Sequence, residues 1–177
     1  LPIAFVFGAL IAATDPVAVI AMFKDNGVGG RLRTLLEAES LFNDAAAAVL
    51  FLLVLPLATG VGAHSPGETA TQLLFVVFGG AAIGAASGAA ALLIAGQSKD
   101  HVVETGVTVL AAYGSFFLAD QAGASGILAA VVAGLLVGNL GVLGQSAVMS
   151  QRAKLFAVEF WDFAAFLANS TVFLLIG

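Results

Sequence analysis

The sequence predicts an all-α membrane protein with six transmembrane helices, and its composition and apolar runs carry this prediction. Of the 177 residues, 60% are hydrophobic and 10% are charged, whereas a soluble domain has about 45–50% apolar and about 25% charged residues. The apolar residues form runs long enough for an α-helix to cross a bilayer, which takes about 20 residues. Because these runs do not alternate apolar and polar residues, they do not fit membrane β-strands.

Six apolar runs define the expected helices. In chain order they cover residues 2–23, 34–57, 69–96, 102–119, 125–142 and 153–177. Pro56 and the Gly-rich residues after it are expected to close the second span, and a turn at 120–123 separates the fourth span from the fifth. Since the chain opens and closes within apolar runs, we interpret it as the central piece of a longer membrane protein.

All basic residues fall in loops that are expected on one side of the membrane. They are Lys24, Arg31, Arg33, Lys99, Arg152 and Lys154, and the opposite loops have none. Cytoplasmic loops carry the excess of Lys and Arg, so we expect these loops in the cytoplasm and the first span to enter from outside. The scattered cations offer no surface for nucleic acid. Compact loops and the Ala-Gly composition favour a bacterial plasma (inner) membrane as the surrounding bilayer.

The first span carries an acid beside a proline, in the sequence Thr14, Asp15, Pro16. Pro16 has no backbone N–H, and the residue before a proline is disfavoured in a helix, so we expect the span to be broken here. An acid in the membrane costs at least ~2.5 kcal/mol on insertion scales, and a broken helix exposes backbone groups that can bind an ion. We therefore predict an ion site at the break. The alternative is an ordinary proline kink, capped by Asp15.

The second span carries a polar stripe of Glu39, Ser40, Asn43 and Asp44. Helical spacing places Ser40 and Asp44 on one face, and Glu39 shares a neighbouring face with Asn43. At 1.5 Å per residue, Asp44 lies about 10–15 Å below the expected cytoplasmic start of the span. Because burial disfavours charge, we expect Asp44 to hold a proton at rest and to lose it when a cation binds. The alternative is a neutral carboxyl group that only packs helices.

The residue types at this site favour a small alkali cation. Carboxylate, hydroxyl and carbonyl oxygens are hard ligands, and the chain has no Cys and no histidine within an expected span to bind a soft metal. No nucleophile and base pair indicates an enzyme, and no cofactor is expected.

Small residues recur at four-residue spacing in the third and fifth spans. They are Gly80, Gly84 and Gly88 in the third span, and Gly134 and Gly138 in the fifth. Such spacing lets helix backbones approach closely, so tight helix packing is the favoured interpretation. A path for solute is the alternative.

These motifs resemble the monovalent cation:proton antiporter family, the sodium/proton exchangers of the bacterial NhaP and animal NHE type. The similarity rests on residues 8–19, GALIAATDPVAV, and on residues 39–44, ESLFND. Weaker similarities follow in the family's order at 134–139, 160–162, 169–170 and 174–177. The resemblance implies that the chain is the central part of an inverted-repeat fold of about thirteen helices.

The resemblance also implies roles for the polar residues. Asp44 would carry proton and Na+ in turn, and the oxygen shell of the ion would include Asp15, Ser40, Thr14 and Glu39, directly or through water. Pro16 would shape the site. Asn43 stands where electrogenic relatives have a second aspartate, which implies electroneutral exchange.

The expected activity is secondary active exchange of Na+ (or Li+) for H+ by alternating access. K+/H+ exchange and a non-transporting, ion-sensing membrane module remain alternatives. The family also implies that the full-length protein forms a homodimer.

Overall fold

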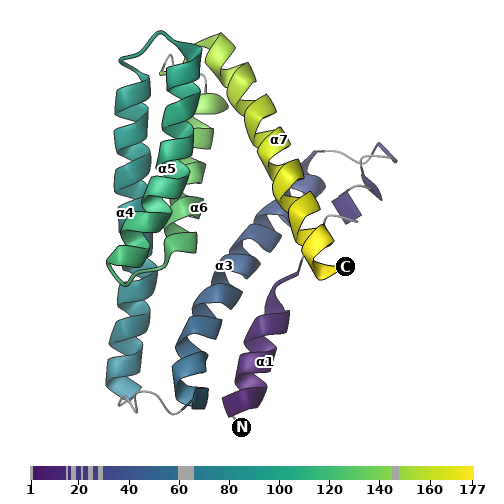
Figure 1. Ribbon diagram of the computed structural model, residues 1–177, viewed down its shortest axis with the longest axis vertical. Helices are drawn as coiled ribbons and strands as arrows, with labels where there is room; N and C mark the ends of the chain where they lie inside the picture. The colour runs from purple at the N-terminus through teal and green to yellow at the C-terminus, as the bar shows by residue number, and fades with distance from the viewer. Residues whose placement is uncertain are drawn as a thin grey trace. The chain divides into compact units, whose positions relative to one another are not determined.

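Figure 1 shows the computed structural model, in which the described elements are helical. The structure describes residues 2–14, 16, 19–20, 22–23, 26–27, 30–59, 66–144 and 148–177. Asp15 and Lys24, which have predicted roles, lie outside these residues. The chain divides into two compact units, Leu1–Gly79 and Gly80–Gly177.

In the first unit α1 (Pro2–Ala12) and α3 (Arg31–Thr59) pack side by side (Figure 1), and the unit also contains the amino half of α4 (Pro66–Ala95). α1 ends four residues before Pro16, although the sequence predicted one apolar span over 2–23. After the proline, the amide of Ile20 donates to the Pro16 carbonyl at 2.8 Å, which is the hydrogen bond of a new helical turn. Asp15 is outside the described residues, so the predicted break at Thr14-Asp15-Pro16 stays a prediction.

The second span was predicted to end at residue 57, and α3 continues two residues further, to Thr59, with Pro56 inside the helix. A proline removes one hydrogen bond of a helix and does not always end it. Thr59 closes the helix by donating its hydroxyl to the Leu55 carbonyl at 3.0 Å. α3 also begins three residues before the predicted start, at Arg31, whose neighbour Arg33 pairs with Glu37 at 2.8 Å.

The second unit contains the carboxyl half of α4 (Pro66–Ala95), followed by α5 (His101–Gln121) and α6 (Gly126–Leu136). The π-helix η1 (Val137–Val142) and α7 (Gln151–Ile176) complete it. A polar residue caps three of these helices: the side chains of Asp100, Ser125 and Ser150 accept backbone N–H groups at the starts of α5, α6 and α7.

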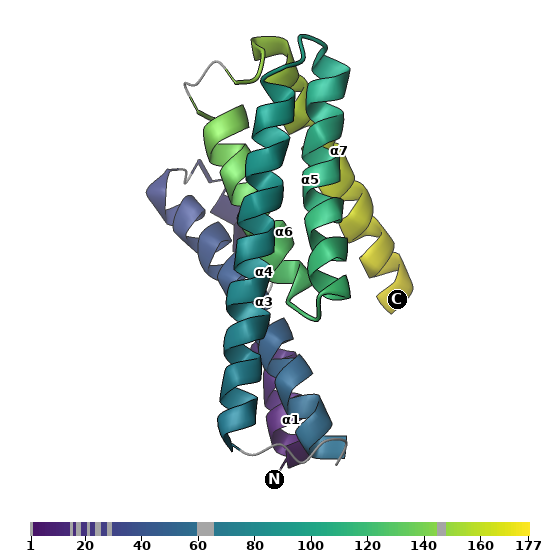
Figure 2. The ribbon, with the colours of Figure 1, turned by 90° about the vertical axis from the view of Figure 1, so that its left-hand side faces the viewer.

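α4 packs closely on α6 (Figure 2), which confirms the tight packing predicted for Gly80, Gly84 and Gly88. A Cβ atom at Gly80 would lie 2.6 Å from the Ser125 carbonyl oxygen, and one at Gly84 would overlap the backbone of Ala129. Ala129 is fully buried. The backbones of these helices therefore touch, and only glycine fits on the α4 side.

The second glycine pair does not pack in this way. A Cβ atom at Gly134 or Gly138 would meet nothing within 4 Å. The predicted helix over 125–142 also changes its hydrogen bonding at Val137, where η1 begins and the Leu143 amide bonds to the Gly138 carbonyl at 2.7 Å. Glycine weakens an α-helix. Gly141 also packs closely against Leu92, because an added Cβ would lie 2.9 Å from a methyl group of that side chain.

Four helices of the described chain are long and apolar enough to cross a membrane. They are Arg31–Pro56, Gly67–Ala95, His101–Gln121 and Gln151–Ile176. The apolar helices Ile3–Ala12 and Gly126–Val142 are shorter, at 10–17 residues. The prediction of six full spans is thus supported for four, because α1 ends early and the fifth run is an α-helix continued by a π-helix.

Replacing Gly84 with alanine should destabilise the full-length protein by about 1–3 kcal/mol, since the added methyl group forces α4 away from α6. Gly106 is the matched control, because it lies in a helix and a Cβ there meets nothing within 4 Å. Alanine at Gly106 should be neutral or slightly stabilising. Unfolding of the purified protein in detergent measures both, and equal midpoints would contradict the packing described.

Candidate functional site

The site in the first unit begins with a backbone carbonyl that lacks its helical partner. In an α-helix the carbonyl of Ala12 would accept the N–H of residue 16. Residue 16 is proline and has no N–H, so α1 cannot continue to satisfy this oxygen. An unpaired carbonyl inside a membrane costs several kcal/mol, so another donor is required.

Asn43 of α3 provides that donor. Its Nδ2 donates to the Ala12 carbonyl at 2.7 Å and to the Thr14 hydroxyl at 3.0 Å. A side-chain amide has two N–H groups, so both are used on the end of α1. An aspartate could not replace this amide, since an ionised carboxylate only accepts hydrogen bonds.

Ser40 makes the second connection between the same helices. Its hydroxyl donates to the Thr14 carbonyl at 2.7 Å, and Ser40 is buried, with 9% of its surface exposed. Ser40 and Asn43 are three residues apart, so they lie on the same face of α3, toward α1. The predicted residues Thr14, Ser40 and Asn43 are therefore brought together.

The acids of the predicted site lie differently. The side chains of Glu39 and Asp44 are exposed in the first unit. No hydrogen bond or ion pair of either acid is found with the described part of the chain. Asp44 follows Ser40 by one helical turn, so it lies on the helix face next to the α1–α3 contact. The assignment of Na+ to Asp44, Asp15, Ser40 and Thr14 stays a prediction.

The oxygen atoms that gather here fit the predicted chemistry. The carbonyls of Ala12 and Thr14 and the Thr14 hydroxyl are hard ligands of the kind that alkali cations prefer. Each is already an acceptor from α3, yet a carbonyl oxygen has a second lone pair that can accept another bond. Sequence reasoning missed Ala12, although a proline four residues after it was a usable signal.

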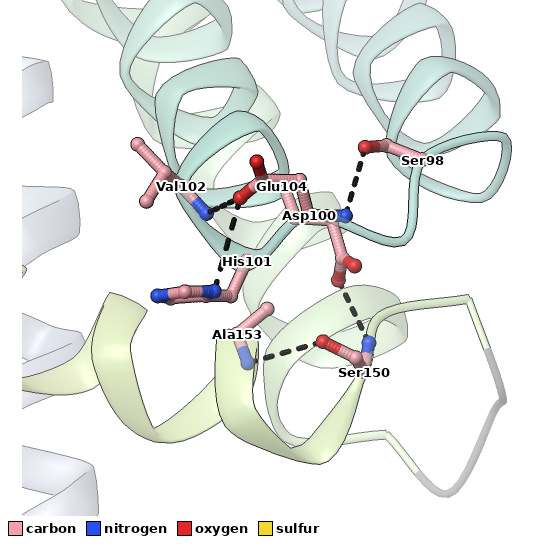
Figure 3. Close-up of polar contacts among 7 residues, drawn as sticks. All are labelled: Ser98, Asp100, His101, Val102, Glu104, Ser150 and Ala153. Atoms are coloured by element: carbon pink, nitrogen blue, oxygen red, sulfur yellow. Dashed lines mark hydrogen bonds and ion pairs between the residues drawn. The ribbon is translucent and has the colours of Figure 1, made fainter.

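Sequence reasoning also missed a buried acid in the second unit, Glu104, even though it lies within the predicted span 102–119. Glu104 is 1% exposed, and its Oε2 accepts the backbone N–H of Ser150 at 2.7 Å (Figure 3). Its Oε1 has no hydrogen-bond partner among the described residues. Because Ser150 caps α7, the carboxyl group lies at the amino end of that helix, where the helix dipole favours negative charge.

A second polar contact joins α5 and α7, one turn further along α5 and about three turns further along α7. Trp161 donates its indole N–H to the hydroxyl of Thr108 at 2.9 Å, and Thr108 is buried. Glu104 and Thr108 are four residues apart, so one face of α5 makes both contacts. This polar seam belongs to the second unit and is separate from the site of Thr14, Ser40 and Asn43.

The long apolar helices and polar groups buried between them define the class as an integral membrane protein. The family model described as "Sodium/hydrogen exchanger, transmembrane" matches residues 1–177. The chain therefore belongs to the sodium/hydrogen exchanger family, as its motifs predicted.

Named relatives agree with this membership. The chain is 41% identical over 177 residues to the Na(+)/H(+) antiporter ApNhaP of Aphanothece halophytica, covering 100% of the chain and 33% of the relative. It is 41% identical over 181 residues to the antiporter NhaG of Bacillus atrophaeus, covering 100% and 34%. With Sodium/hydrogen exchanger 7 of Arabidopsis thaliana it shares 35% identity over 96% of the chain and 15% of the relative. The chain thus spans about a third of the length of the first two relatives.

Replacing Asn43 with alanine should destabilise the full-length protein by about 1–3 kcal/mol, since it leaves the Ala12 carbonyl without a donor. The cost should be smaller when Pro16 is also replaced by alanine, because residue 16 then has an N–H to offer. We expect a coupling energy of about 0.5–3 kcal/mol in this double-mutant cycle. Asn139→Ala is the control, since that amide is exposed and bonds to its own helix at Leu135. Strictly additive effects of the two substitutions would be inconsistent with the proposed compensation.

Proposed function

We propose that the full-length protein exchanges Na+ or Li+ for H+ across the membrane as a secondary active transporter. Asp44 carries the proton and the cation in turn, and one ion gradient drives the other without a cofactor. The names of the relatives, which are Na(+)/H(+) antiporters, support this class of activity. These relatives are transporters, and this also favours a transporter over an enzyme as the function of the full-length protein.

The observation that carries the proposal is the pair of side chains that hold the end of α1. Ser40 and Asn43 bind oxygens of Ala12 and Thr14, and both side chains lie within one helical turn of Asp44 along α3. A carboxyl group next to ordered carbonyl oxygens can bind a dehydrated alkali cation when ionised. When it is protonated, the same group is neutral and the attraction for the cation is lost. Competition between the two ions for Asp44 therefore couples their movements.

The remaining predicted residues complete the proposed ion shell. Asp15 and Glu39 add carboxylate oxygens, directly or through water, and Pro16 maintains the carbonyl geometry by removing the amide that would otherwise continue α1. Asn43 is neutral and uses its amide to hold α1. Of positions 43 and 44, only Asp44 has a carboxyl group that can carry a proton. One proton is therefore exchanged for one cation, and transport is electroneutral.

The larger context is also part of the proposal. The site opens to each side of the membrane in turn within a fold of about thirteen helices arranged as inverted repeats. The full-length protein is a homodimer in the plasma membrane of a bacterium. Its basic segments, which carry Lys24, Arg31 and Arg33, then Lys99, and then Arg152 and Lys154, face the cytoplasm.

The test measures how an imposed proton gradient collapses in inside-out vesicles that contain the full-length protein, when Na+, Li+ or K+ is added. Wild type should respond to Na+ or Li+, and Asp44→Asn should abolish the response, because an amide neither binds a proton nor carries charge. Glu37→Gln is the matched control: Glu37 is an exposed acid of the same helix, paired with Arg33. It should transport like wild type.

Other outcomes separate the alternatives. A response to K+ alone would replace Na+/H+ by K+/H+ exchange, and no response to any cation would favour the ion-sensing module. If Asp44→Asn still exchanges ions at normal expression, Asp44 is a structural acid and the proposed coupling is wrong.

A further inference from the structure

The second unit contains a cavity of about 450 Å³ between α5, α6, η1 and α7. Three of its lining side chains carry polar atoms, and the other lining residues are alanine, glycine, valine and leucine. Packed protein interiors have few voids larger than a water molecule. We therefore expect another group to fill this space in the full-length protein.

The three polar side chains of the cavity wall are Thr108, Trp161 and Asp162. Two of them satisfy each other, because the Trp161 indole N–H donates to the Thr108 hydroxyl at 2.9 Å. The same hydroxyl donates its own proton to the Thr105 carbonyl at 2.8 Å. Asp162 differs, since no hydrogen bond or ion pair of its carboxyl group is found with the described part of the chain. The acid of the cavity wall thus requires a partner from elsewhere.

Asp162 lies near the middle of a helix that is long and apolar enough to cross a membrane. It is the twelfth residue of α7, which places it about 16 Å from the start of the helix at 1.5 Å per residue. The hydrocarbon core of a bilayer is about 30 Å thick. Acids at such a depth are costly, and they pair with another group of the protein or line a water-filled space.

The basic residues of the second unit do not provide this partner. They are Lys99, Arg152 and Lys154, and none of them lines the cavity. Lys154 lies two helical turns before Asp162 on α7, and it donates to the Gly144 carbonyl at 2.6 Å. The first two relatives have about two thirds of their length outside the region that matches this chain. A basic residue of that remaining part is therefore the expected partner.

Two glycines of the cavity wall indicate that the partner comes on a helix. A Cβ atom at Gly134 or Gly138 would meet nothing within 4 Å, and their four-residue spacing allows close approach of a helix backbone. Gly80 and Gly84 of α4 have the same spacing and touch the backbone of α6. The wall opposite Asp162 thus allows a neighbouring helix to come close to the acid.

We propose that a transmembrane segment of the full-length protein outside residues 1–177 fills this cavity and places an arginine or lysine side chain against Asp162. The aliphatic part of such a side chain packs on apolar residues while its charged head reaches the acid. The pair satisfies Asp162 within the membrane, and the apolar walls enclose it. The inference concerns how the full-length protein is assembled, and it does not depend on the proposed exchange activity.

The first test measures thermal unfolding of the purified full-length protein in detergent. Asp162→Asn should lower the unfolding midpoint by about 5 °C or more, because it leaves the charge of the partner buried without a counter-ion. Asp162→Glu keeps the acid and should recover at least half of this loss. Glu159→Gln is the matched control, since Glu159 is an exposed acid of α7 that does not line the cavity. The control should stay within about 2 °C of wild type, and equal midpoints for Asp162→Asn and Glu159→Gln overturn the proposal.

The second test identifies what fills the cavity. A photoreactive diazirine side chain replaces Val158, which lines the cavity, and is activated in membranes that contain the full-length protein. Mass spectrometry should find a cross-link within the same chain to a peptide outside residues 1–177, with Lys or Arg within one helical turn of the labelled residue. Neutralising that basic residue together with Asp162→Asn should restore the midpoint to within about 2 °C of wild type, because removing both charges of a buried pair costs little.

Each remaining outcome overturns the proposal. A cross-link to lipid shows that a lipid chain fills the cavity, and a cross-link between two copies assigns this face to a dimer interface. A cross-link confined to residues 1–177, or a peptide without Lys or Arg, excludes the proposed partner. If the effect of Asp162→Asn disappears when Na+ is removed, Asp162 binds a cation instead. Because none of these measurements requires transport, loss of exchange in the wild type would refute the proposed function alone.

Discussion

The missing amide of Pro16 is the constraint on which the first unit depends. In a membrane each backbone carbonyl needs a donor from the protein itself, and Pro16 removes the one that belongs to Ala12. α3 supplies the replacement from Asn43, and Ser40 does the same for Thr14. These bonds explain why an apolar helix carries an amide and a hydroxyl in its middle. They also fix the end of α1 beside the turn that holds Asp44, so one defect in hydrogen bonding creates both the helix contact and a cluster of ordered oxygens.

The second unit solves its packing differently. There the backbones of α4 and α6 approach directly, because glycine at positions 80 and 84 leaves no side chain between them. Polar contacts join α5 to α7, at Glu104 and Thr108. A cavity of about 450 Å³ lies between α5, α6, η1 and α7.

Helix type and approximate extent could be predicted from the sequence, because apolar runs in lipid must be helical to satisfy their backbones. The ends were less predictable. Pro56 was expected to end a helix and lies inside one, since the loss of one hydrogen bond is small beside the rest of a long helix. The change to a π-helix at Val137 has no local signal of its own. It accompanies the contact of Gly141 with two side chains outside the fifth run. One is Leu92 on α4, and the other is Met149, which follows the end of the run.

The sequence by itself determined the membrane class, the family and the polar residues of the first site, because apolar run length, proline chemistry and acids within apolar helices are local properties. Only the tertiary structure decided how those residues are used. It assigned Asn43 and Ser40 to the carbonyls of α1, placed Glu104 at the start of α7, and separated one glycine series in contact from another facing a cavity. The physical reason is that hydrogen-bond satisfaction and close packing depend on which helix faces which, and equal spacing along a chain does not specify the partner.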